Sequence, residues 1–239
     1  MPQRMGKYTI ELTNTPSIVG YAAVVGDKEA KGPLGQCFDK TYKDAFFGEK
    51  TFEKAETKMQ KMTIETAVKK SGLSKGDIQI AFAGDLLNQC IGSFFGLKGM
   101  EIPLIGLYGA CSTMALSMLM AANGVDSGLA QTAAASTSSH FCSAEKQFRM
   151  PLEYGGQRTP TAQWTATAAG AAVSAGAAAA TSAAPGTSAP GRRQSVGSPW
   201  GPTAQTFCRQ GTSSPSSKKM ASSSPSAVDS HSKLALSVS

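Results

Sequence analysis

Along the first two thirds of the chain, the apolar residues follow two patterns, one typical of strands and one typical of helices. Short apolar runs predict strands at residues 8–12, 18–25, 78–83, 104–108 and 129–137. Apolar positions at helical spacing predict a helix over residues 52–70, and further helices open at residue 86 and run over residues 114–122. Strands that alternate with helices predict an α/β fold: a mostly parallel sheet with helices on both faces.

A sharp corner between a strand and a helix is predicted at Gly109-Ala110-Cys111-Ser112-Thr113. The strand at 104–108 runs into the helix at 114–122 with no polar loop between them, and Gly109 leaves room for the turn. Cys111 then stands at a helix N-terminus, where free amides and the helix dipole favour a thiolate. This is the geometry of a nucleophile elbow with sulfur in place of serine. The alternative is that Cys111 is a small buried hydrophobic residue, as many free cysteines are.

Three chemically capable residues follow predicted strands: Asp85, Cys111 and His140. In open α/β sheets, sites gather beyond the carboxyl ends of the strands, so we expect these residues to lie near one another. Each has a simpler explanation. Asp85 is also suited to cap a helix, and His140 could be a hydrogen-bonded histidine without a chemical role.

Charge divides the chain into two parts. Residues 1–163 carry 17 Lys and Arg against 15 Asp and Glu, whereas residues 164–239 carry 6 against 1. The net charge of +7 is therefore mainly a property of the last third, and it gives little reason to expect a nucleic-acid partner. The five cysteines form no Cys-x-x-Cys pair, so we expect neither a disulfide framework nor a zinc site. We also expect no signal peptide and no transmembrane span.

Several motifs together are similar to those of the stage V sporulation protein AD family. The similarity extends from about residue 5 to about residue 173. It is carried by Gly32-Pro33-Leu34-Gly35, Phe38-Asp39-Lys40-Thr41-Tyr42, Ala83-Gly84-Asp85-Leu86-Leu87-Asn88-Gln89, Gly109-Ala110-Cys111-Ser112-Thr113, Ser138-Ser139-His140, Ala144-Glu145-Lys146-Gln147-Phe148-Arg149 and Glu153-Tyr154-Gly155-Gly156-Gln157.

This resemblance implies a thiolase-like scaffold of two similar halves, of which residues 1–173 are the N-terminal half. It implies a non-catalytic protein that binds dipicolinic acid and supports its uptake into the developing spore. Other proteins of the same sporulation operon would be partners, and the intact family would be homodimeric. The implied location is the cytoplasm or forespore, peripheral at the spore inner membrane. The resemblance implies no metal and no cofactor.

A flat dianion such as dipicolinate needs cationic or N–H donors around it. The helix N-terminal amides near Ser112 are one such set, and arginine can contact a carboxylate through two bonds. The candidate ligand-binding residues are Asp85, Cys111, Ser112, His140, Arg149 and Arg158. The alternative is an acyltransferase of the thiolase or ketoacyl synthase type with Cys111 as nucleophile, although the residues that complete such a site in the second half have no counterparts here.

The last third of the chain differs sharply in composition. In residues 164–239, 54 of 76 residues are Ala, Ser, Gly, Thr or Pro, and there is no Ile. So little large apolar surface cannot offset the entropy of ordering, so residues 174–239 are predicted to be a disordered low-complexity tail. The change suggests an unrelated or frameshifted tail, or a truncated nonfunctional product. We expect a lone half to expose apolar surface and to self-associate.

Overall fold

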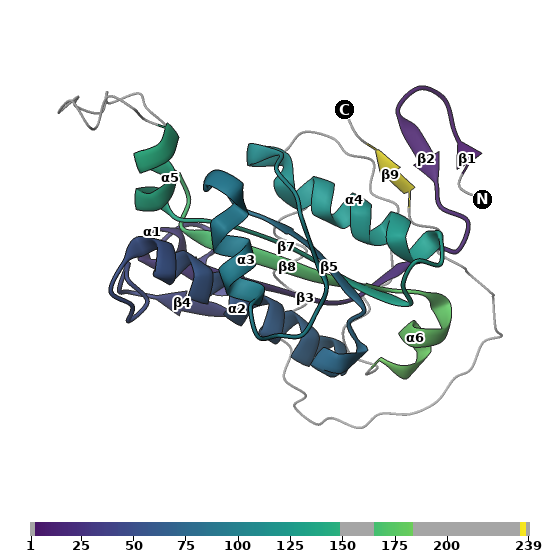
Figure 1. Cartoon of the computed structure of the whole chain (residues 1–239), viewed down its shortest axis with the longest axis horizontal. Helices are drawn as coiled ribbons and strands as arrows, with labels where there is room; N and C mark the ends of the chain where they lie inside the picture. The colour runs from purple at the N-terminus through teal and green to yellow at the C-terminus, as the bar shows by residue number, and fades with distance from the viewer. Residues whose placement is uncertain (1–2, 149–164, 184–234, 238–239) are drawn as a thin grey trace, which may run out of the picture.

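The computed structural model describes residues 3–148, 165–183 and 235–237. In these ranges the strands are β1 (Gln3–Arg4), β2 (Thr9–Glu11), β3 (Ser17–Gly26), β4 (Lys40–Tyr42), β5 (Ile80–Gly84), β6 (Leu104–Gly106), β7 (Thr132–Ser139), β8 (Ala168–Ala175) and β9 (Ala235–Ser237). The helices are α1 (Asp27–Ala30), α2 (Phe52–Ser71), α3 (Ile91–Leu97), α4 (Thr113–Asp126), α5 (Phe141–Phe148) and α6 (Ala177–Ser182), with short 3₁₀ turns η1 (Gly35–Cys37), η2 (Lys75–Asp77), η3 (Asn88–Cys90) and η4 (Ala110–Ser112) (Figure 1).

Six strands form the main sheet, in the order β4-β3-β8-β7-β5-β6. β5 is parallel to β6 and β7, and β3 is parallel to β4, which confirms the predicted parallel pairing. β8 is antiparallel to both of its neighbours, β3 and β7, and this pairing was not predicted. The result is a mixed sheet. Strands β1, β2 and β9 form a separate small sheet.

Helices cover both faces of the main sheet, as predicted. Side chains of β5 alternate between the faces: Ala81 and Ala83 belong to the core cluster under α2, whereas Phe82 packs with residues of α4. Helices α2 and α4 therefore lie on opposite sides of the strands (Figure 1). We call these the α2 face and the α4 face. The α/β class with helices on both faces is confirmed.

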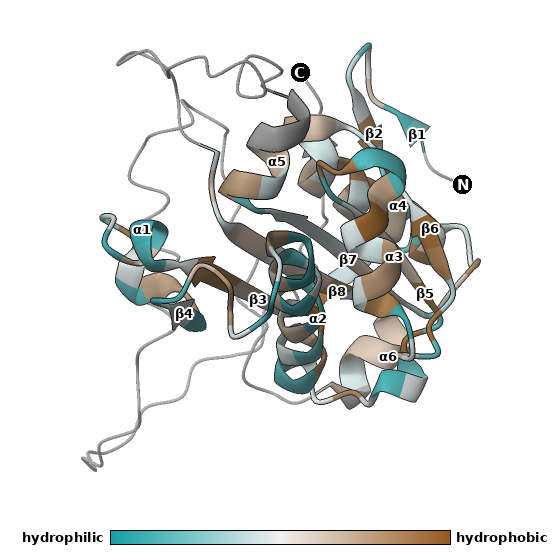
Figure 2. Ribbon diagram, turned by 60° about the vertical axis from the view of Figure 1, so that its left-hand side comes forward, coloured by the Kyte–Doolittle hydropathy of each residue, from teal (hydrophilic) through white to brown (hydrophobic). Residues whose placement is uncertain are grey.

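Helix α2 forms where the hydrophobic pattern predicted it. Thr51 caps its start by accepting a hydrogen bond from the amide of Lys54. Gly72 ends it in the left-handed conformation (φ 74°), which glycine adopts without steric cost. The outer side of α2 is hydrophilic, whereas α4 ranges mainly from neutral to hydrophobic (Figure 2).

Strand β8 departs from the prediction that structure gives way to a tail near residue 173. It lies between β3 and β7, and Ala171, Val173 and Ala175 are buried. Its neighbours supply backbone hydrogen bonds on both edges, so large side chains are not needed to hold it. Small residues also suit the close approach of α2: a Cβ at Gly20 of β3 would stand 2.4 Å from the Ala67 carbonyl oxygen. Ordered structure continues through α6, and most of the predicted tail lies outside the described residues.

Strand β6 also differs from expectation. The run at 104–108 was predicted to be a buried strand, but β6 is the last strand at its side of the sheet. Ile105 is 43% exposed and Tyr108 is 53% exposed, because no further strand is present in the described residues to cover them. A second difference concerns Cys37, which is disulfide-bonded although the cysteine spacing gave no reason to expect it.

Candidate functional site

The corner after β6 is built as the sequence predicted. Leu107 pairs its amide with the Ala83 carbonyl, after which η4 turns the chain into α4. Ala110 has a positive φ of 46°, an uncommon conformation for a residue with a side chain. Gly84 makes the tight corner possible, since a Cβ there would lie 1.9 Å from the Leu107 oxygen. The strand-to-helix corner is therefore confirmed.

Cys111 is exposed at this corner, so it is not the small buried residue of the alternative interpretation. Ser112 occupies the N-cap position of α4 but makes no capping bond with its side chain. Its hydroxyl donates instead to the Gly109 carbonyl at 2.7 Å. The hydroxyl of Thr113 donates to the Ala110 carbonyl and accepts from the Gly109 amide. These bonds close the turn and leave the thiol facing outward.

Asp85 is fully buried immediately after β5. One carboxylate oxygen accepts from the amide of Leu87 at 2.8 Å. The other accepts from both the amide and the hydroxyl of Ser93, at 2.7 and 2.6 Å. Three donors of this kind hold the loop between β5 and α3. Asp85 is not the N-cap of α3, which is Cys90, but it does bond the Ser93 amide in the first turn of that helix. In this position the carboxylate presents no oxygen to solvent.

His140 is fully buried in the corner between β7 and α5. Its Nε2 lies 2.9 Å from the Ala45 carbonyl oxygen, and its Nδ1 accepts from the Cys142 amide at 3.2 Å. These partners fit a neutral ring with its proton on Nε2. Burial lowers the pKa of His140, with the hydrogen bond to Ala45 opposing it. The rings of Phe52 and Phe141 flank it, with centroids 5.0 and 5.1 Å away.

Glu56 is the site residue that the sequence analysis missed. It lies on the sheet side of α2, fully buried, and accepts hydrogen bonds from Ser138 at 3.1 Å and Ser143 at 2.7 Å. The pKa of Glu56 is raised to about 7, chiefly by burial and also by the nearby charge of Asp85, while the two serine bonds oppose the shift. The helical stripe that includes Ala55 and Met59 could have revealed it, because Glu56 falls on the same side.

The sheet divides the predicted site residues into two groups. Backbone convergence is real, since Gly84 pairs with Thr137 and Ala83 pairs with Gly106 at the carboxyl ends of the strands. The side chains separate, however. Asp85 is linked through Ser93 to Gln60 of α2, and His140 packs on Phe52 of the same helix. Cys111 and Ser112 stand at the start of α4 on the other face. Arg149 and Arg158 lie outside the described residues.

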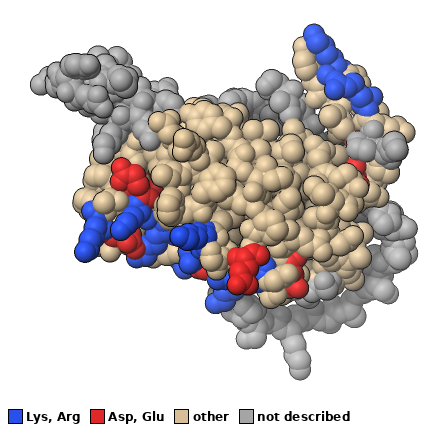
Figure 3. Space-filling model, viewed as in Figure 1, with Lys and Arg blue, Asp and Glu red and all other residues tan. Residues whose placement is uncertain are grey.

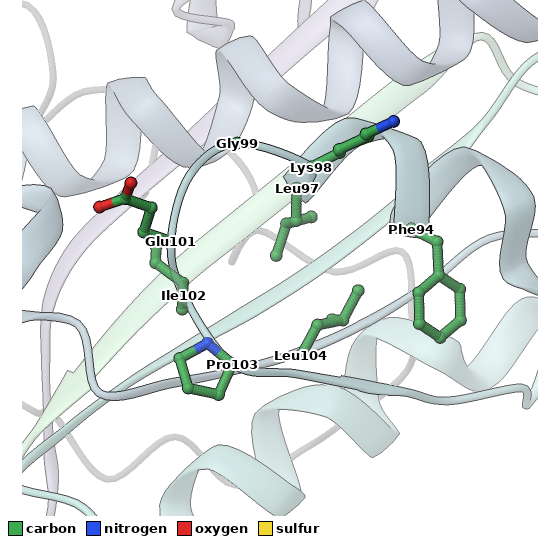
Figure 4. A pocket seen from close by; sticks show the side chains of 8 residues that line it. All are labelled: Phe94, Leu97, Lys98, Gly99, Glu101, Ile102, Pro103 and Leu104. Atoms are coloured by element: carbon green, nitrogen blue, oxygen red, sulfur yellow. The ribbon is translucent and has the colours of Figure 1, made fainter.

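A shallow hollow of about 420 Å³ lies beside β6 and contains none of the predicted site residues. Figure 4 shows it open between the end of α3 and the chain leading into β6. It is lined by Phe94, Leu97, Lys98, Gly99, Glu101, Ile102, Pro103 and Leu104. In the part of the chain that the structure describes, no three His, Cys, Asp or Glu side chains gather as a metal site would require. Within the same ranges no helix has the length and apolarity that crossing a bilayer demands.

Comparison with known proteins gives one family. The model of the family described as stage V sporulation protein AD matches residues 6–189. Stage V sporulation protein AD of Bacillus subtilis is 40% identical over 157 residues, which are 66% of this chain and 46% of that protein. This chain thus spans about half the length of the curated relative it matches.

Several solved structures are similar to this chain. They include an OleA variant from Xanthomonas campestris (TM-score 0.49, 13% identity, 72% of this chain and 59% of that one). A fungal type III polyketide synthase has a TM-score of 0.47 at 12% identity, covering 73% and 58% of the two chains. The 3-oxoacyl-(acyl carrier protein) synthase III from Aquifex aeolicus has a TM-score of 0.43 at 16% identity, covering 67% and 53%.

Proposed function

Because this chain belongs to the stage V sporulation protein AD family, we propose that it is a sporulation protein that binds dipicolinic acid and supports its uptake into the developing spore. The observation that carries the proposal is the family match over residues 6–189, which includes every residue of the candidate site. The relative from Bacillus subtilis extends well beyond the matched part, which is 46% of its length, so the proposal for uptake includes partners from the same sporulation operon.

The exposed corner at Cys111 supplies the ligand contact in this proposal. Dipicolinate is flat and carries two carboxylates, so it needs directed N–H donors and cations. The start of α4 offers the former, and Arg149 and Arg158 are the cationic candidates. Asp85 and His140 are buried and hydrogen-bonded, so in this proposal they hold the segments that follow β5 and β7 and do not contact the ligand. In this arrangement the protein binds without catalysis.

Dipicolinate binding is tested by isothermal titration of the full chain. Benzene-1,3-dicarboxylate is the matched control ligand, because it has the same carboxylate spacing without the ring nitrogen. We expect binding of dipicolinate and a loss of about tenfold or more on Arg149→Ala or Arg158→Ala, since bonds to charged groups contribute about 1.5–3 kcal/mol. Equal affinity of the wild type and both variants would refute the electrostatic part of the proposal.

Acyl transfer is the second candidate, and the exposed Cys111 at a strained corner favours it. A competent nucleophile needs a base within reach. Both ring nitrogens of His140 already have backbone partners, which weighs against that histidine in the role. The rate of iodoacetamide labelling as a function of pH separates the candidates. A rate that levels off near neutral pH supports acyl transfer, whereas one that keeps rising to about pH 8.5, as for an ordinary thiol, supports binding alone.

A second copy of this chain is the partner proposed for the edge at β6. Unpaired strand edges recruit other strands, and this one is bordered by exposed apolar side chains. Ile91, Phe94, Phe95, Ile105 and Tyr108 are between 43% and 56% exposed. Lys98 and Glu101 flank the same hollow (Figure 4). In a twofold contact, Lys98 of one copy can meet Glu101 of the other, because isologous interfaces pair each patch with itself. Operon partners and the spore inner membrane would be engaged elsewhere.

A further inference from the structure

The network around Glu56 contains a buried acid without a cation. None of the ion pairs in the described residues involves Glu56. The charged groups facing it are both acidic: Asp85 from the end of β5, and Glu53 from its own helix. His140 lies between the two serines, but its ring bonds the Ala45 carbonyl instead. A negative charge on Glu56 is therefore opposed by burial and by its neighbours, and only two hydroxyl groups support it.

The two serines lie on either side of His140. Ser138 is near the end of β7, and Ser143 is in the first turn of α5. Their hydroxyls reach different oxygens of the carboxylate, Oε1 and Oε2. Ionised Glu56 thus joins α2 to both ends of the short segment that carries His140. Ser143 also has a second acceptor, the His140 carbonyl at 3.3 Å, to which its hydroxyl can turn.

We propose that Glu56 is a positioning residue whose proton decides how tightly the His140 corner and the start of α5 are held. With Glu56 ionised, both serine hydroxyls donate to it and the corner is fixed to α2. With Glu56 protonated, one of its oxygens becomes a donor, and Ser143 turns to the His140 carbonyl. The first turn of α5 then loses its link to α2.

This control would extend to the ligand site, a step that rests on the proposed function. Arg149 is one of the two candidate cationic contacts for the ligand, and it follows directly after α5 in the sequence. Loosening the start of α5 therefore changes the segment that leads to this arginine. His140 cannot be the sensor above neutral pH, because burial lowers its pKa and its ring stays neutral there. Glu56 is the group in this network that changes charge near neutrality.

Hydrogen exchange of the full chain tests the proposal without any ligand. The readout is protection of the Ala144 amide, which bonds the His140 carbonyl at 2.9 Å, measured from about pH 5 to about pH 9 and corrected for intrinsic exchange. We expect protection of the Ala144 amide to rise by roughly threefold or more as the pH increases through about 7. The rise should stay within about tenfold, because one hydrogen bond contributes on the order of tenfold or less. Glu56→Gln carries a neutral amide in place of the protonated acid, so it should show at every pH the low protection that the wild type has in acid.

Two further variants keep the result decisive. Ser143→Ala removes the link but leaves the acid, so it should abolish the pH dependence of Ala144 protection, whereas overall unfolding should still depend on pH because Glu56 remains buried. Glu65→Gln, at a partly exposed ion pair of the same helix, should behave as the wild type. A pH-independent wild type, or a midpoint that survives in Glu56→Gln, overturns the proposal.

Dipicolinate affinity as a function of pH is a separate measurement. If dipicolinate binds, its affinity should follow the same midpoint in the wild type and lose it in Glu56→Gln, and an affinity that keeps that midpoint in the variant counts against the proposal. If dipicolinate does not bind while Ala144 responds as expected, the proposed function fails and the role of Glu56 stands.

Discussion

The helices on the two faces of the main sheet differ in where their polar and apolar residues lie. On the α2 face, the helix has a charged outer side. Under its first half it covers two groups of buried, hydrogen-bonded side chains: Glu56 with Ser138 and Ser143, and Gln60 with Ser93 and Asp85. On the α4 face, the helix has no charged residue before Asp126, and Ala115 is exposed. Charged residues accordingly gather at one side in Figure 3 and are sparse over α4.

This difference indicates that the two faces have different surroundings. A helix that is apolar around most of its circumference is normally buried, whereas α2 has the amphipathic pattern of a helix that faces water. The α4 face therefore has the character of a surface that packs against another surface. The exposed thiol of Cys111 lies on this apolar face, and the buried polar side chains lie on the α2 face.

The largest expected effect is at the junction of the two faces, Gly84. Gly84→Ala places a Cβ against the Leu107 oxygen and the Thr113 methyl group, at 1.9 and 2.7 Å. Backbone must move to accept it, so we expect a loss of about 3 kcal/mol or more in the free energy of unfolding by urea. Gly76→Ala is the control, because its Cβ would make only an ordinary contact at 3.8 Å. Equal losses in the two variants would show that the corner is not tight.

Glu56→Gln tests whether the polar network costs stability. The folded-state pKa of about 7 exceeds the usual 4.5, so folding takes up a proton between these values, and the stability due to Glu56 is lost as the pH rises. The variant should match the wild type below about pH 4.5 and exceed it by up to about 3 kcal/mol above pH 7. Urea midpoints across this range measure the difference. A variant that is less stable than the wild type at high pH would contradict this expectation, because it would mean that the fold stabilises ionised Glu56 better than the neutral amide.

Self-association distinguishes the two uncovered surfaces. Ile105→Lys places a charge on the exposed edge of β6, and Ala115→Lys places one on α4. We expect the first to lower the average mass in sedimentation velocity, with less than about 0.5 kcal/mol of effect on folding. We expect the second to change the mass less. The reverse ranking would assign the contact between copies to the α4 face instead.

The sequence predicted what depends on local pattern and missed what depends on neighbours. The helix at 52–70 and the corner at Cys111 follow from periodicity and from glycine at a tight turn, and both are present. Strand β8 was missed because its small side chains are sufficient only between β3 and β7. The stripe of α2 could have placed Glu56 on the buried side. Its partners Ser138 and Ser143 lie more than 80 residues away in sequence, so no local pattern could identify them. Side-chain direction likewise separated Asp85 and His140 from Cys111.

The smallest expected difference concerns the caps of the two helices. Thr51 accepts a bond from the Lys54 amide at 3.3 Å, whereas Ser112 makes no side-chain capping bond. Thr51→Ala should therefore cost about 0.5–1 kcal/mol in urea unfolding, the low end for a cap because the bond is long. Ser112→Ala loses only an exposed bond to the Gly109 carbonyl, so its cost should stay below about 0.5 kcal/mol. If Ser112→Ala proved the more costly of the two, its hydroxyl would be holding the corner at Cys111, and α4 would depend on that turn rather than on a cap.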